Sequence, residues 1–152
     1  MLKESKFRVL TNDNRYLNQM IHLESHNMKV SQEFVKTQFS NPTVEWASVL
    51  LQGQVVGFVR FQFPQDNNSI YIESLQIAQP FRGGKLFQIL ASVILKNSFD
   101  KDIEIDVNLP SQSLYKMYQK MNFKERKRNQ RQARLILKKE HVSKIESWLK
   151  QR

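Results

Sequence analysis

The stretch Leu75–Leu90, LQIAQPFRGGKLFQIL, decides the fold. It leaves a strand-like run, passes through Arg82-Gly83-Gly84-Lys85, and continues with apolar residues at helical spacing. This pattern predicts a strand, a glycine turn and a helix. The N–H groups of a first helical turn point outward and glycine lets a phosphate approach the backbone, so the turn is a candidate anion site. Taken alone, two glycines are also typical of an ordinary connection between a strand and a helix.

Strand-like segments come before the glycine turn. Trp46–Leu51 and Val55–Phe63 are apolar runs joined by Gln52-Gly53-Gln54, which is a hairpin signal. Ser69–Ala78 is rich in β-branched and aromatic residues and leads directly into the turn. Three consecutive strands with short connections predict an antiparallel meander.

The N-terminal third predicts one strand and two helices. Phe7–Leu10 is a short strand, and Asp13–Glu24 carries an apolar helical stripe that Asn12 or Asp13 is expected to cap. Ser31 is expected to cap a second, shorter helix.

After the glycine turn, helical and strand patterns alternate. Asp102–Asn108 alternates strictly and is expected to lie parallel to Ser69–Ala78 through a right-handed crossover. The remaining expected elements are a helix over Ser111–Met121, a hairpin of Phe123–Arg128 and Ala133–Lys138, and a last helix over Val142–Leu149. The order predicts an α+β fold, with a mixed, mostly antiparallel sheet and helices on both faces, in a single domain over residues 1–152.

Composition excludes several classes of protein. The 152 residues contain no cysteine, which excludes disulfides, a thiolate nucleophile and cysteine-ligated metals. Met1–Leu10 lacks the apolar core of a secretory signal peptide. The most apolar window, Leu86–Leu95, is too short to cross a bilayer. We therefore expect a cytoplasmic protein with no membrane partner.

The net charge of +10 is concentrated at one end of the chain. Residues 1–115 hold eleven Lys/Arg and eleven Asp/Glu, whereas residues 116–152 hold thirteen Lys/Arg and three Asp/Glu. Such an asymmetry is typical of a surface that binds an anionic partner, and equally of a solvated basic face. Nucleic acid is therefore a candidate partner of residues 124–139.

With its flanks, Leu75–Leu90 resembles motif A of the GNAT acyltransferases, which bind the pyrophosphate of acyl-CoA at this kind of turn. Leu75-Gln76-Ile77 matches the L-x-V of that family's fourth strand, and Arg82-Gly83 matches the opening of its R-G-x-G-x-G/A. Lys85 and Phe87 stand where the family has small residues, and Gly84 lies one position early.

A second segment resembles motif B of the same family. Ser111–Phe123 follows the pattern N-x-x-A-x-x-x-Y-x-x-x-G-F, with Tyr118 and Phe123 at the family's spacing. Ser111 replaces the Asn, and Asn122 replaces a Gly at which left-handed geometry is expected. The resemblance covers residues 55–139 and implies the GNAT fold.

The resemblance implies direct transfer of an acetyl group from acetyl-CoA, as co-substrate, to an amine acceptor that is a small molecule or a peptide. The implied cofactor-binding residues are Leu75, Gln76, Ile77, Arg82, Gly83, Gly84, Lys85, Leu86, Phe87 and Ser111. By this resemblance, the backbone of Leu75 to Ile77 would form hydrogen bonds with the amides of the pantetheine arm.

Direct transfer needs two proton movements, and the resemblance points to two residues. Tyr118 is the candidate acid that stabilises the leaving thiolate, although its place on an apolar helical stripe also fits core packing. Glu73 is the candidate base, because burial in mid-strand would raise its pKa. A cross-strand pair between Glu73 and Arg60 is the alternative.

Other functions stay open beside this one. The chain is alternatively a GNAT-fold module without catalysis that binds acyl-CoA or nucleic acid, or an acetyltransferase acting on an RNA-borne amine such as aminoacyl-tRNA. A homodimer and a monomer are both compatible with the sequence. His22 and His26 lie four apart, but their segment is not H-E-x-x-H, so we expect a surface helix and no bound metal.

Overall fold

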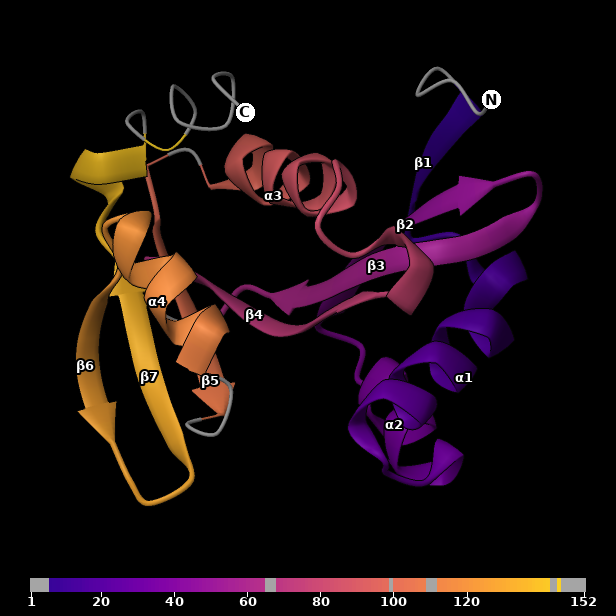
Figure 1. Ribbon diagram of the computed structural model, residues 1–152, viewed down its shortest axis with the longest axis horizontal. Coiled ribbons are helices and arrows are strands. Elements are labelled where there is room, and N and C mark those ends of the chain that lie inside the picture. Colours follow the sequence, from indigo (N-terminus) through magenta and orange to yellow (C-terminus); the bar gives the residue numbers. More distant parts are fainter. Residues whose placement is uncertain (1–5, 65–67, 99, 109–111, 143–144, 146–152) are drawn as a thin grey trace. The chain divides into compact units, whose positions relative to one another are not determined.

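The computed structural model describes residues 6–64, 68–98, 100–108, 112–142 and 145 (Figure 1). In these ranges seven strands form one sheet in the order β1-β2-β3-β4-β5-β7-β6. The β4–β5 pair is parallel, whereas the pairs β1–β2, β2–β3, β5–β7 and β6–β7 are antiparallel. The strands are β1 (Phe7–Thr11), β2 (Val44–Leu51), β3 (Gln54–Gln62), β4 (Ser69–Ile77), β5 (Asp102–Asn108), β6 (Lys124–Arg128) and β7 (Gln132–Leu137). The helices are α1 (Leu17–Met28), α2 (Gln32–Phe39), α3 (Leu86–Asn97) and α4 (Gln112–Lys120), with short 3-10 turns η2 (Asn14–Tyr16), η3 (Gln79–Phe81) and η4 (Lys139–His141).

The chain divides into two compact units. The first comprises Met1–Gln62 and Ser74–Val93, and the second comprises Phe63–Glu73 and Ile94–Arg152. Strand β4 therefore contributes its beginning to the second unit and its end to the first. None of the described helices is long and apolar enough to cross a membrane.

In the first unit, the β2–β3 hairpin forms where the sequence predicts it. The two residues of its turn, Gln52 and Gly53, have φ angles of 53° and 78°. Two consecutive left-handed residues make the tight turn whose twist matches that of the flanking strands. The predicted hairpin is confirmed.

Helices cover both faces of β3 in the first unit. Phe58 is fully buried in a core cluster with residues of α1 and α2. The neighbouring Gly57 turns toward α3, where an added Cβ atom would lie 3.5 Å from Leu86 and 3.6 Å from Leu90. Since adjacent residues of a strand face opposite sides, α1 and α2 pack on one side of β3 and α3 packs on the other. The predicted layering is confirmed here.

The helix starts follow the sequence closely, with shifted boundaries. Asp13 accepts a hydrogen bond from the backbone N–H of Arg15 and caps η2, so α1 begins later than predicted, at Leu17. Ser31 caps α2 by accepting from the N–H of Phe34 at 3.1 Å. The helix predicted over Val142–Leu149 lies largely outside the described residues.

The second unit contains the predicted parallel crossover. Ser69–Ile72 of β4 pairs with Asp102–Ile105 of β5, and β5 pairs on its other side with β7. Strand β6 is the edge of this part of the sheet and pairs with β7. The alternating pattern of β5 places Ile103, Ile105 and Val107 in the core.

Candidate active site

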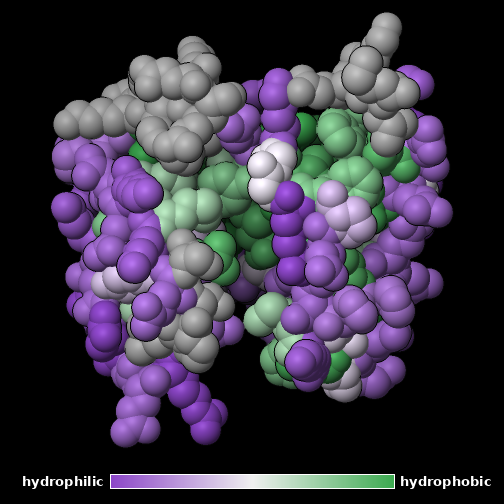
Figure 2. All heavy atoms as spheres, viewed as in Figure 1, coloured by the Kyte–Doolittle hydropathy of each residue, from purple (hydrophilic) through white to green (hydrophobic). Residues whose placement is uncertain are grey.

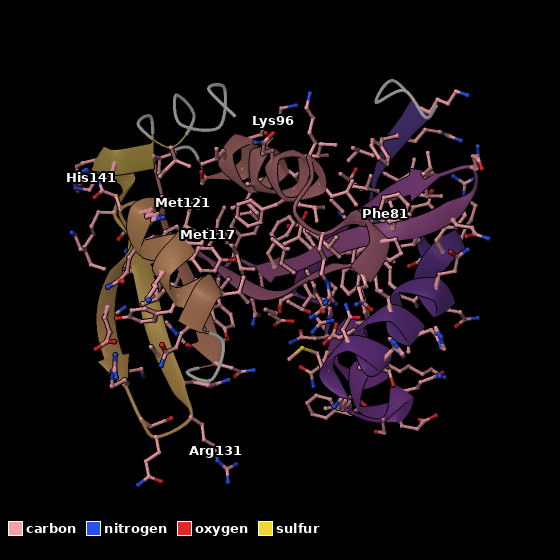
Figure 3. All side chains as sticks on the ribbon, in the orientation of Figure 1. Phe81, Lys96, Met117, Met121, Arg131 and His141 are labelled. Atoms are coloured by element: carbon pink, nitrogen blue, oxygen red, sulfur yellow. The ribbon has the colours of Figure 1, made fainter. Side chains whose placement is uncertain are left out.

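The glycine turn joins β4 to α3 within the first unit, and η3 with Phe81 leads into it (Figure 3). Gly83 has a φ angle of 80°, which a residue with a side chain rarely adopts. A Cβ atom on Gly84 would meet only the Phe81 carbonyl oxygen, at 3.6 Å. Arg82, Gly83, Gly84 and Lys85 are all exposed. The turn therefore presents backbone and two cationic side chains to solvent.

The buried Leu86 fixes the start of α3 directly after this turn. It is 1% exposed and packs toward β3, while Phe87 is half-buried. The Lys85 carbonyl accepts from the N–H of Ile89 at 3.0 Å, so the helical hydrogen bonds begin at Lys85. The first N–H groups of an α-helix have no acceptor within the helix, and its dipole favours an anion at this end.

Hydrogen bonds connect the end of β4 to α1 and to the glycine turn. Asn27 donates to the Gln76 side chain at 3.2 Å and to the Ile77 carbonyl at 3.3 Å. Nε of Arg82 donates to the same carbonyl at 3.1 Å. Gln76 is buried and also donates to Ser74, whereas Leu75 is half-buried. The Ile77 carbonyl oxygen thus accepts from two side chains.

Gly57 is a positioning residue that the sequence analysis missed. A Cβ atom there would lie 3.2 Å from the backbone oxygen of Gln76. The glycine therefore lets β3 approach β4 closely under α3. An isolated glycine inside a strand is the signal that could have found it.

Tyr118 lies on α4 and belongs to the second unit. It is 5% exposed, and burial raises the pKa of its hydroxyl far above the ordinary value. The helix ends in a Schellman motif: the N–H of Phe123 donates to the Tyr118 carbonyl and that of Asn122 to the Gln119 carbonyl, both at 3.0 Å. Asn122 has the predicted left-handed conformation, with φ 75°.

The Tyr118 ring also has a structural contact. It meets the Phe123 ring edge to face, with 5.2 Å between the centroids. Such an apolar contact across the helix end commonly accompanies a Schellman motif. Both the packing role and a role for the hydroxyl are therefore compatible with the position of Tyr118.

Glu73 is half-buried and is the first residue of β4 beyond its parallel ladder with β5, which ends at Ile72. Strand alternation places Glu73 on the face of Tyr71, opposite Ile72. Burial is the main cause of the raised pKa of Tyr71, and the nearby Glu73 carboxylate adds a small part. Arg60, the alternative partner of Glu73, donates to both carboxylate oxygens of Glu24 at 2.7 and 3.2 Å in the first unit.

Three polar side chains that the sequence patterns did not single out, Tyr71, Asp106 and Arg134, come together on the face of the second unit that carries Glu73. The Tyr71 hydroxyl donates to Asp106 at 2.8 Å, and Arg134 donates to both oxygens of Asp106 at 2.5 and 3.0 Å. Burial and the hydrogen bond to Asp106 raise the pKa of Tyr71 to about 12. Burial alone would raise the pKa of Asp106, but the bonds from Arg134 and Tyr71 outweigh it and lower that pKa.

Ser111 and the His22–His26 pair, both considered in the sequence, add little to the description of the site. Ser111 lies outside the described residues. The rings of His22 and His26 stack 6.4 Å apart on α1. In the described ranges, no three His, Asp or Glu residues come together as metal ligands.

Comparison with known proteins gives one family match. The model of the Acetyltransferase (GNAT) family matches residues 12–123. No curated protein matches the chain.

Several solved structures share the fold. Mutant forms of the spermidine/spermine N-acetyltransferase of Vibrio cholerae are 16% identical, with 95% of this chain and 99% of that chain covered and a TM-score of 0.67. The ribosomal-protein-S18-alanine N-acetyltransferase of Escherichia coli is 13% identical, with 86% and 90% covered and a TM-score of 0.70. The PaiA N-acetyltransferase of Thermoplasma acidophilum, solved with coenzyme A, is 13% identical, with 87% and 98% covered and a TM-score of 0.66. At these identities the likeness concerns the fold alone.

Proposed function

Because the chain belongs to the GNAT acetyltransferase family, we propose that it transfers the acetyl group of acetyl-CoA directly to an amine, on a small molecule or a peptide. The observation that carries this proposal is the glycine turn before α3, where Gly83 is left-handed and Gly84 leaves its backbone uncovered. Related folds solved with coenzyme A add support.

The turn has the properties that a pyrophosphate requires. The N–H groups at the start of α3 supply donors and a favourable dipole, and the glycines let the phosphates approach the backbone. Arg82 and Lys85 are exposed and supply positive charge beside these donors. Leu86, buried under the turn, keeps the helix start in place, while Phe87 flanks it.

The end of β4 is the proposed partner of the pantetheine arm, through the backbone of Leu75, Gln76 and Ile77. The ladder between β4 and β5 covers only Ser69–Ile72, so the later residues of β4 lie beyond it. The Ile77 carbonyl already accepts from Asn27 and Arg82. These two donors hold the strand end next to the turn, and Arg82 links the two parts of the cofactor site.

Glu73 is the proposed base. A typical amine is protonated at neutral pH, with a pKa near ~10, so it must lose a proton before it attacks the thioester carbon. Attack forms the C–N bond and puts a positive charge on the nitrogen, which then loses its second proton to water. Collapse of the tetrahedral species breaks the C–S bond and releases the thiolate. The half-buried position of Glu73 on β4 supports its role as acceptor of the amine proton, directly or through water.

Tyr118 is the proposed stabiliser of the thiolate. Since burial raises its pKa, the hydroxyl stays protonated throughout the reaction. A thiol is the stronger acid, with a pKa near ~8.5, so a full proton transfer from Tyr118 would be unfavourable. We therefore assign to Tyr118 a hydrogen bond to the developing thiolate.

The proposal is tested with acetyl-CoA and a panel of amines. Acetyl-CoA should raise the Tm of the protein by mass action, and at least one polyamine or peptide amine should release thiol from it. In the active assay, Glu73→Gln should remove the acidic limb of the pH–rate profile if Glu73 accepts the proton.

Each result has a defined meaning. An unchanged Tm at millimolar acetyl-CoA would refute the cofactor site. A raised Tm without thiol release from any amine would favour a binding module that lacks catalysis. A wild-type pH profile of Glu73→Gln would assign the proton to another acceptor.

A further inference from the structure

The second unit carries five cationic side chains on the neighbouring elements α4, β6 and the β6–β7 turn, and we name them together the basic edge: Lys116 and Lys120 of α4, Lys124 and Lys127 of β6, and Arg131 of the turn. All five are exposed. Figure 3 shows Arg131 at the tip of the hairpin, directed away from the strands, and Figure 2 shows hydrophilic side chains gathered over this hairpin. The edge collects a large part of the positive charge that residues 116–152 carry.

The cations of the basic edge are not held in close ion pairs, although the charge of Lys127 adds to the lowering of the pKa of Asp106. Neighbouring arginines are paired with carboxylates: Arg126 with Glu104 at 2.9 Å, and Arg128 with Glu125 at 2.5 Å. In contrast, none of the five side chains of the basic edge forms an ion pair within the described part of the chain. A cluster of unpaired, exposed cations attracts a polyanion over distances of about the Debye length, which is ~8 Å at physiological salt.

A pocket adjoins these cations. It has a volume of about 290 Å³ and lies between α4 and β6, lined by Gln112, Tyr115, Lys116, Gln119 and Arg128. Glu125 accepts from Tyr115 at 2.8 Å and from Arg128 at 2.9 Å, and the guanidinium lies 5.9 Å from the centre of the Tyr115 ring. Arg128 is thus held in place, with amide donors of two glutamines beside it.

The chemistry of this surface fits repeated phosphates. Lysines are compact charges on flexible stems, which suits a chain of similar anions. Lys116 and Lys120 are four residues apart and therefore neighbours on one helix face. Strand alternation and the contact of Arg128 with Tyr115 place Lys127 on the other side of β6, so the cations lie on both sides of the edge.

We propose that the basic edge binds the phosphodiester backbone of a single nucleic-acid strand, with the pocket between α4 and β6 taking one phosphate or base. This surface shares no residue with the proposed acetyl-transfer site, although Lys116 and Lys120 lie on the same helix as Tyr118. The proposal does not depend on that function. The favourable free energy of binding comes from counterions released from the phosphates, so binding is largely independent of the nucleotide sequence.

The test is the affinity of the full chain for a fluorescent twenty-nucleotide oligouridine at 50 and 200 mM salt. For four phosphate contacts on a single strand, a log–log slope of about 0.7 per contact predicts a loss of about 50-fold. The matching oligothymidine should bind within about threefold of the RNA, since the backbone carries the energy. Loss of binding to the DNA, or no binding of either oligonucleotide at 50 mM salt, would overturn the proposal.

Charge-reversal variants locate the surface. Lys116→Glu with Lys120→Glu should weaken oligouridine binding by at least tenfold. The control, Lys36→Glu with Lys96→Glu, makes the same change in net charge at exposed helical lysines elsewhere and should weaken it by less than about threefold. Equal losses in the two variants would show that net charge alone attracts the oligonucleotide and would refute a located site.

A polyglutamate of equal length separates phosphate from carboxylate. If polyglutamate binds as tightly as oligouridine, the surface is one for acidic proteins and the nucleic-acid assignment is wrong. Weak binding of polyglutamate, with strong binding of both oligonucleotides, supports it. Circular dichroism of both variants verifies that each is folded before affinities are compared.

Discussion

The turn before α3 and the end of α4 share one backbone feature, a residue in the left-handed conformation, but differ in their exposure to solvent. Each contains a left-handed residue, Gly83 with φ 80° and Asn122 with φ 75°. The turn is exposed, and no atom lies within 4 Å of a Cβ atom built on Gly83. At the end of α4, Tyr118 and Phe123 are buried, with their rings in contact.

The difference separates function from stability. At the turn, the backbone itself is the proposed binding group, so a change there should alter cofactor affinity and leave the fold intact. At the end of α4, the proposed functional side chain is also part of the core. A change there must keep the packing if it is to report on chemistry.

The largest expected effect is on turnover by Tyr118→Phe. This variant keeps the ring and its contact with Phe123 and removes only the hydroxyl. If the hydroxyl stabilises the thiolate, turnover should fall by ~10²–10⁴ with a Tm close to that of the wild type. Thiol release with the best amine of the panel measures it.

Phe123→Leu is the matched control for Tyr118→Phe. It weakens the same contact without removing a hydroxyl, so it should lower the Tm and leave the turnover of the folded protein near normal. If Tyr118→Phe kept full turnover, Tyr118 would be a packing residue only, and the two regions would differ more sharply than we propose.

The next effect is on cofactor affinity at the turn. Gly84→Asp places a side chain and a negative charge where the pyrophosphate is expected, so we predict at least a tenfold weaker Kd for acetyl-CoA, which is about 1.4 kcal/mol. The Tm without cofactor should not change, because a Cβ atom at this position meets only the Phe81 oxygen at 3.6 Å. Isothermal titration and thermal unfolding measure the two quantities.

Gly84→Ala divides that effect into its two parts. It adds the Cβ atom without the charge, so its Kd should lie between those of the wild type and Gly84→Asp. An aspartate variant that bound acetyl-CoA normally would place the phosphates elsewhere.

The smallest effect is on stability at the end of α4. Asn122→Ala puts an unfavourable residue at φ 75° and should cost ~1 kcal/mol, which lowers the Tm by about 2–4 °C in a protein of this size. Asn122→Gly suits the same conformation and should be as stable as the wild type or slightly more stable. An alanine variant with an unchanged Tm would mean that the helix end adapts without cost.

Much of the proposed site was visible in local sequence. A short segment of sequence is enough to predict the glycine turn, the Ser31 cap and the left-handed Asn122, because each depends on residues within a few positions of one another. The order of strands and helices was likewise predicted, because each element carries its own period. Boundaries shifted where a short 3-10 turn preceded a helix, as at α1.

The sequence by itself thus determined the order of elements and the two motifs, whereas only the tertiary structure decided which distant side chains meet. Asn27 reaches the Ile77 carbonyl across fifty positions, and Arg134 reaches Asp106 across twenty-eight. Gly57 became informative only once β4 lay against it. Strand register and helix docking fix these contacts, and both depend on burial of the whole apolar core, a property that no short segment carries.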